Sequence, residues 1–111
     1  MPKRKGKLKR RRRIRGGFYF KNSQGVEYEV IFRKPDEKAY DGADGVCFSP
    51  DDERPRIYIS PHLTNQGELN TIIHEFCHAF FWEASEREVY GLAGALSRFL
   101  YNRQGWRKKD K

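Results

Sequence analysis

Residues 69–82 read Leu-Asn-Thr-Ile-Ile-His-Glu-Phe-Cys-His-Ala-Phe-Phe-Trp, and their spacing decides the expected fold. Apolar side chains recur at intervals of three and four residues, which is the period of a helix with one buried face. The pattern begins near Gln66 and ends near Trp82. We therefore expect an amphipathic helix, rich in aromatic residues, over residues 66–82.

A second helix is expected to follow at once. Ser85-Glu86-Arg87-Glu88 has the Ser-x-x-Glu pattern of a capping box, which marks the start of a new helix. Apolar residues then recur at helical spacing up to Gly105, a residue type that often follows a helix end. The two helices should therefore meet at a corner near Ala84 and Ser85.

Four short apolar runs precede the first helix and read as strands, because turn-forming residues separate them. These runs cover residues 18–20, 26–32, 46–48 and 57–59. The expected fold class is α+β, with a small antiparallel sheet of about four short strands packed on the two helices. Residues 57–60 are expected to flank a substrate cleft as an edge strand.

Charge divides the chain of 111 residues into three parts. The net charge is +8, yet residues 1–15 hold ten Lys or Arg and no acid, and the segment between the termini is mildly acidic. We expect a disordered basic arm over residues 1–16, one domain over 17–106 and a basic tail over 107–111.

The arm and the bulk composition suggest partners and a compartment. A dense basic run binds phosphate backbones without sequence preference, so nucleic acid is one expected partner, although such runs also serve as solubilising tails, localisation signals or contacts to acidic proteins. The arginines expected to bind are Arg10, Arg11, Arg12 and Arg13. Without an apolar span or a signal core, we expect a cytoplasmic protein with no membrane partner. The sequence leaves the oligomeric state open.

His74 and His78 are the candidate metal ligands, because histidines four residues apart on a helix project from the same face. Neutral imidazole nitrogens in this arrangement can bind one zinc ion, at about 2.0–2.1 Å. Glu75 cannot easily reach the same ion but can take a proton from a water that the metal activates. The pattern therefore predicts a peptidase with one Zn²⁺ per chain, Glu75 as general base and a protein or peptide substrate.

A catalytic zinc takes three protein ligands and keeps one open position, so a third ligand must come from elsewhere. Glu86 is the preferred candidate, since Val89 and Ala93 place it on the inward side of the second helix. The alternatives are Glu83, Glu88 and His62.

Four further residues are weaker candidates for a role in the site. Tyr58 and Tyr90 could donate a hydrogen bond to an oxyanion, although tyrosines commonly just bridge core and surface. Cys77 and Cys47 are interpreted as small core residues and not as ligands.

Residues 57–106 resemble small zincin-type metallopeptidases, in particular the compact metallopeptidases of phages and prophages, distantly similar to the ImmA/IrrE type. The resemblance rests on Ile57-Tyr58-Ile59, on 71–79 with Trp82, on 85–89 leading to 96–100, and on Gly105-Trp106. It implies a minimal gluzincin-like core, in which a second helix supplies a glutamate ligand that maps best onto Glu86. If the protein is phage-encoded, the host cytoplasm is the expected location.

The alternative function is a nucleic-acid-binding protein with a structural or vestigial zinc site. A closed site with four protein ligands would favour structure, whereas three ligands and a water favour catalysis. No further Cys or His stands at finger-like spacing in the sequence, so the open catalytic site is favoured.

Overall fold

The computed structural model describes residues 17–109. The predicted basic arm, with Arg10 to Arg13, lies outside the described residues, as do 110–111. The elements in chain order are β1 (Phe18–Lys21), β2 (Glu27–Phe32), α1 (Glu37–Tyr40), β3 (Gly45–Cys47), β4 (Arg56–Ile59), α2 (Asn65–Phe80), α3 (Glu86–Arg98) and a π-helical turn (Phe99–Arg103). None of the helices in this part of the chain is both long enough and apolar enough to cross a membrane.

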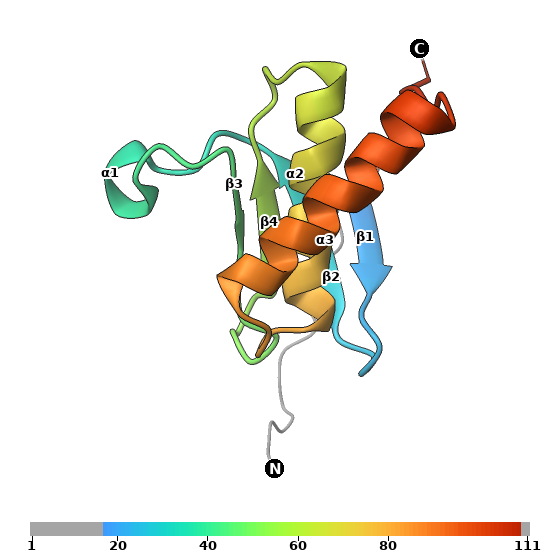
Figure 1. The fold of residues 1–111 in the computed structure, drawn as a ribbon. Coiled ribbons are helices and arrows are strands. Elements are labelled where there is room, and N and C mark those ends of the chain that lie inside the picture. The colour runs from blue at the N-terminus through green and yellow to red at the C-terminus, as the bar shows by residue number, and fades with distance from the viewer. Residues whose placement is uncertain (1–16, 110–111) are drawn as a thin grey trace.

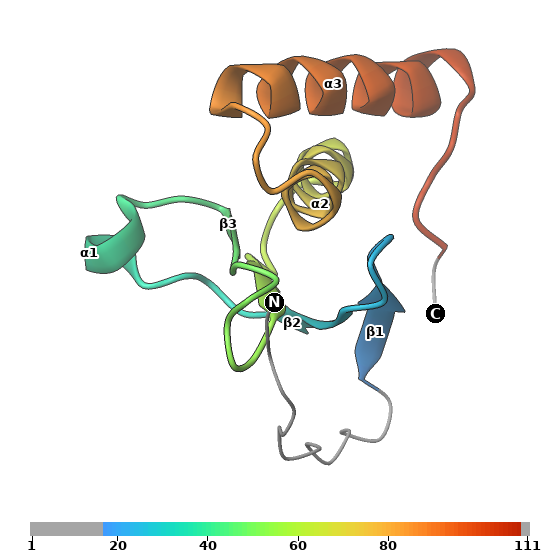
Figure 2. The same ribbon diagram turned by 90° about the horizontal axis from the view of Figure 1, so that it is seen from below.

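The elements form three layers, which Figures 1 and 2 show from two sides. One sheet with the strand order β1-β2-β4-β3 makes the first layer. Helix α2 packs on one face of the sheet, and α3 crosses α2 on the side away from the sheet (Figure 2). The predicted α+β class, with four strands and two helices, is confirmed.

The prediction of a wholly antiparallel sheet was wrong for one strand pair. β1 and β2 are antiparallel, as are β3 and β4, but β2 and β4 run parallel with Val30 opposite Ile57. The chain therefore leaves β2 through α1 and β3 before it returns, and the sheet is mixed.

The predicted edge position of residues 57–60 was also wrong. β4 lies between β2 and β3, and the edge next to it is the three-residue strand β3. Ile57, Tyr58 and Ile59 are all buried, so this strand is apolar on both faces, which suits a central position. Among residues 17–109, the short strand β3 is paired on one side only, and its other edge is open.

The core lies between the sheet and α2. Tyr28, Ile57, Ile59 and Ala79 form its buried centre, and the ring of Phe20 stacks on that of Phe76 with centroids 3.9 Å apart. The apolar stripe of α2 predicted from the spacing thus faces the sheet.

The predicted helix boundaries are close to those observed. α2 begins after the N-cap Thr64 and ends at Phe80. The capping box is confirmed, since Ser85 Oγ accepts a hydrogen bond from the amide of Glu88 and Glu88 Oε1 accepts one from the amide of Ser85. Gly105, with φ +75°, follows the π-helical turn as the expected stop.

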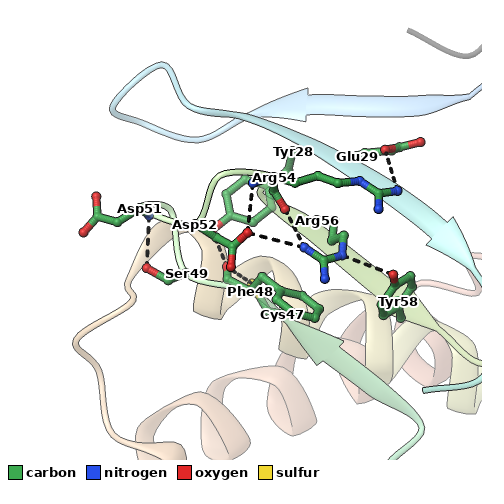
Figure 3. A network of polar contacts seen from close by, with 10 residues as sticks. All are labelled: Tyr28, Glu29, Cys47, Phe48, Ser49, Asp51, Asp52, Arg54, Arg56 and Tyr58. Carbon is green, nitrogen blue, oxygen red and sulfur yellow. Dashed lines mark hydrogen bonds and ion pairs between the residues drawn. The ribbon is translucent and has the colours of Figure 1, made fainter. Parts of the chain in front are cut away.

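The loop between β3 and β4 is held by the polar network in Figure 3. The Arg56 guanidinium donates to the backbone oxygen of Arg54 and to the Tyr58 hydroxyl, and it lies 3.5 Å from the centre of the Phe48 ring. The Tyr28 hydroxyl donates to the backbone oxygen of Phe48 at 2.8 Å. These contacts fix the end of β3 and hence the position of its open edge.

Asn22 connects the β1–β2 turn to the end of α2. Its side-chain Oδ1 accepts hydrogen bonds from the amides of Gln24 and Val26, and its Nδ2 donates to the backbone oxygen of Ala79 at 3.1 Å. The side chain is buried, so each of these groups depends on the others for its partner.

We expect Asn22→Ala to lower the free energy of unfolding by about 2–3 kcal/mol, because it leaves buried amide and carbonyl groups without partners. Urea denaturation measures the change, and Ser23→Ala, an exposed position in the same turn, is the matched control. A loss no larger than that of the control would contradict the anchoring role of Asn22.

Candidate metal centre

The corner between α2 and α3 brings the first turn of α3 over the histidine face of α2. Phe81 and Ala84 close this corner through backbone hydrogen bonds from the Phe81 amide to Cys77 and from the Ala84 amide to Phe81. Val89 and Ala93 are 2% and 0% exposed, which fixes the inward face of α3. The first helical residue of α3 is Glu86.

The side chains of His74, His78 and Glu86 meet at this corner. His78 Nε2 lies 2.8 Å from Glu86 Oε1, and His74 Nε2 lies 3.4 Å from the same oxygen. One nitrogen or oxygen of each residue falls within a group whose members are all within 4.8 Å of one another. These three residues could therefore hold a metal ion between them.

The other predicted ligand candidates are arranged differently. His62 and Glu83 are exposed and do not join the group, and Glu88 is held in the capping box. Glu86 is thus the candidate that the fold places beside both histidines, and its role as a ligand stays a prediction.

Burial lowers the pKa of His74, and the neighbouring Glu86 carboxylate offsets this only in part. A lowered pKa favours the neutral imidazole, which is the form that binds a metal. The Tyr90 ring stands edge-on to His74, with centroids 5.4 Å apart. The His74 side chain is thereby enclosed between its own helix, α2, and the neighbouring helix α3.

Glu75 lies on the side of α2 that faces β3 and is only 6% exposed. Burial, followed by the negative charge of Glu86, raises the pKa of its carboxyl group to about 8. Gly45 in β3 passes so close that a Cβ atom there would stand 2.9 Å from Glu75 Oε2 and 2.6 Å from Thr71 Cγ2. Glycine is therefore the residue at position 45 that leaves room for the Glu75 side chain.

A cleft of about 630 Å³ joins the metal candidates to Glu75. Its walls come from α1, β3, α2, the corner that follows α2 and the first five residues of α3. Aromatic rings of Tyr40, Trp82 and Tyr90 line it, and so does the whole of β3. Tyr90 therefore reaches the cleft as the sequence suggested, whereas Tyr58 is not among its lining residues.

The two cysteines differ in their surroundings. Cys77 is buried, as expected of a core residue. Cys47 packs against the core and also lines the cleft, so the interpretation as a core residue was incomplete. Burial, and then the charge of Glu75, raise the pKa of the Cys47 thiol to about 12.

Sequence reasoning missed the part of the cleft before β4. The sequence patterns gave neither Gly45 nor Tyr40 a role in the site. A glycine directly before an apolar run can signal close backbone approach, which was the available clue. Tyr40 carries no such signal, because its position depends on the path of the chain through α1.

Comparison with known proteins places this geometry in a family. Residues 26–97 match the model of the IrrE N-terminal-like domain, a peptidase family. No curated protein and no solved structure matches the chain. The matched segment covers well over half of the sequence, from β2 through α3, and includes both histidines, Glu75 and Glu86. The predicted resemblance to the ImmA/IrrE type is thus confirmed, and the chain belongs to the IrrE N-terminal-like domain family of peptidases.

Proposed function

We propose that this chain is a zinc metallopeptidase, in which His74, His78 and Glu86 hold one zinc ion and Glu75 is the general base. The convergence of three donor side chains beside a buried glutamate in one cleft carries this proposal. Membership of a peptidase family supports the same reaction class.

The donor set fits zinc. Two imidazole nitrogens and one carboxylate oxygen form a typical catalytic zinc site with an open fourth position. Among residues 17–109, no further His, Cys, Asp or Glu joins the group of three. A structural zinc site would close with a fourth protein ligand, so the set favours catalysis.

A zinc ion held there would supply a Lewis acid that acidifies water and polarises a peptide carbonyl. Glu75 takes the proton from the attacking water and passes it to the leaving amine. Burial raises the pKa of the Glu75 carboxyl group, which favours proton uptake, and the positive charge of a zinc ion in the site would act in the opposite direction. Tyr90 also lines the cleft, and we assign its hydroxyl as a hydrogen-bond donor to the substrate oxygen.

The open edge of β3 supplies a docking site for an extended substrate. Ladder hydrogen bonds join Phe48 to Arg56 and Ser60 to Asp44, so alternate residues of β3 face β4. The backbone groups of Gly45 and Cys47 therefore point away from β4, into the cleft. An unpaired strand edge binds an extended peptide as an added strand, and the neighbouring rings can take its side chains.

Metal content of protein purified without a metal-affinity tag should be about one zinc per chain, as one catalytic site requires. His78→Ala and Glu86→Ala should each lose most of it, because each removes one of three ligands. Glu88→Gln is the matched control, since glutamine preserves the capping box and Glu88 lies outside the group. Zinc retained by Glu86→Ala but lost by Glu88→Gln would contradict the ligand assignment.

Glu75→Gln should retain zinc but lose activity on a quenched fluorescent peptide library by about 100-fold or more, the usual contribution of a general base. The neutral amide has nearly the same shape and cannot accept the proton. Zinc content of the same sample is the control for an intact site. Equal activity of Glu75→Gln and the unchanged protein would refute the role of Glu75.

Gly45→Ala should bind zinc normally while peptide hydrolysis falls by about 10- to 100-fold, because a small displacement of a catalytic group has effects of that size. The added methyl group meets Thr71 and Glu75 but none of the three metal ligands. Gly91→Ala is the control, since a Cβ atom at Gly91 meets nothing within 4 Å. Full activity of Gly45→Ala would show that Glu75 tolerates displacement.

A further inference from the structure

Helix α3 has an exposed apolar flank that the proposed peptidase site does not use. Leu92 is 50% exposed and Phe99 is 51% exposed, and Leu96 beside them is also exposed. Side chains at these intervals share one side of a helix. Large apolar residues grouped on one exposed face typically mark an interaction surface.

This flank lies on the side of α3 away from the cleft. At about 100° per residue, Tyr90 and Phe99 point in opposite directions from the helix axis. Tyr90 lines the cleft together with Glu86, while Val89 and Ala93 face α2. A partner bound over Leu92 and Phe99 would therefore leave the cleft accessible.

The flank is complementary to itself when two copies run antiparallel. If a two-fold axis passes between Ala95 and Leu96, Leu92 of one copy lies opposite Phe99 of the other, and the small Ala95 side chains of both copies lie close to the axis. The same register places Glu88 opposite Arg103 of the second copy. Glu88 lies in the first turn of α3, and Arg103 ends the wide π-helical turn, about one turn after Phe99.

We propose that this chain forms a homodimer through antiparallel pairing of two α3 helices along Glu88, Leu92, Ala95, Phe99 and Arg103. Apolar contacts occupy the centre of the pairing and opposite charges its two ends, as a symmetric interface requires. Both catalytic clefts stay open, and the interface braces the helix that carries Glu86.

Sedimentation equilibrium of the full chain, from low micromolar to several hundred micromolar concentration, tests this pairing. The unchanged protein should dimerise reversibly, whereas Leu92→Glu and Phe99→Glu should weaken association at least about tenfold, because each buries a charge at the centre. Tyr90→Glu is the control: Tyr90 is 67% exposed and lies on the opposite flank, so this change should leave the dimer intact. A monomer at every concentration, or a dimer unaffected by both changes, would overturn the proposal.

The charged ends provide a second test. Arg103→Glu should weaken the dimer by placing two acids opposite each other, and adding Glu88→Gln should restore part of the association because the repulsion disappears. Glutamine preserves the capping box, so a folding defect is not expected. If Glu88→Gln restores nothing, the proposed register is wrong.

Crosslinking checks the axis even if a charged variant misfolds. Ala95→Cys should form a disulfide between copies under mild oxidation, since side chains at the axis come within the roughly 4 Å that the bond requires. Arg87→Cys, exposed on another side of α3, and the unchanged protein with Cys47 and Cys77 are the controls. Equal crosslinking of Ala95→Cys and Arg87→Cys would overturn the proposed pairing.

Discussion

The packing of α3 across α2 is the constraint on which the candidate site depends. Val89 and Ala93 are almost fully buried against α2, and this fixes both the crossing of the helices and the rotation of α3 about its own axis. With the rotation fixed, Glu86 has to stand over His74 and His78. Burial of a few small apolar side chains thus places a carboxylate that is itself 67% exposed.

A second constraint acts from the other wall of the cleft. β3 approaches α2 so closely that a Cβ atom at Gly45 would overlap Thr71 and Glu75, and the Arg56 network holds the loop that continues from this strand. Close approach excludes water from Glu75, and that burial raises the pKa of its carboxyl group. The packing of the edge strand β3 therefore raises the pKa of Glu75, the residue that we assign as general base.

The two flanks of α3 have different proposed functions. One carries Glu86 and Tyr90 toward the cleft, and the other presents Leu92 and Phe99 to solvent. Because the flanks diverge around one rigid helix, association through the second flank would restrict motion of the first without covering it.

The sequence by itself determined the two long helices, the capping box, the four strands, the α+β class and the family resemblance, because these follow from periodicity and from residues close along the chain. The spacing of His74 and His78 also predicted that both would face one point. Local patterns could not decide the parallel pairing of β2 with β4 or the edge position of β3, since strand order depends on contacts between distant segments. Only the tertiary structure brought Glu86, rather than Glu83, Glu88 or His62, beside the histidines, and only it placed Gly45 against Glu75. The crossing of two helices and the order of strands in a sheet depend on how surfaces pack, and the spacing of residues along the chain does not specify that packing.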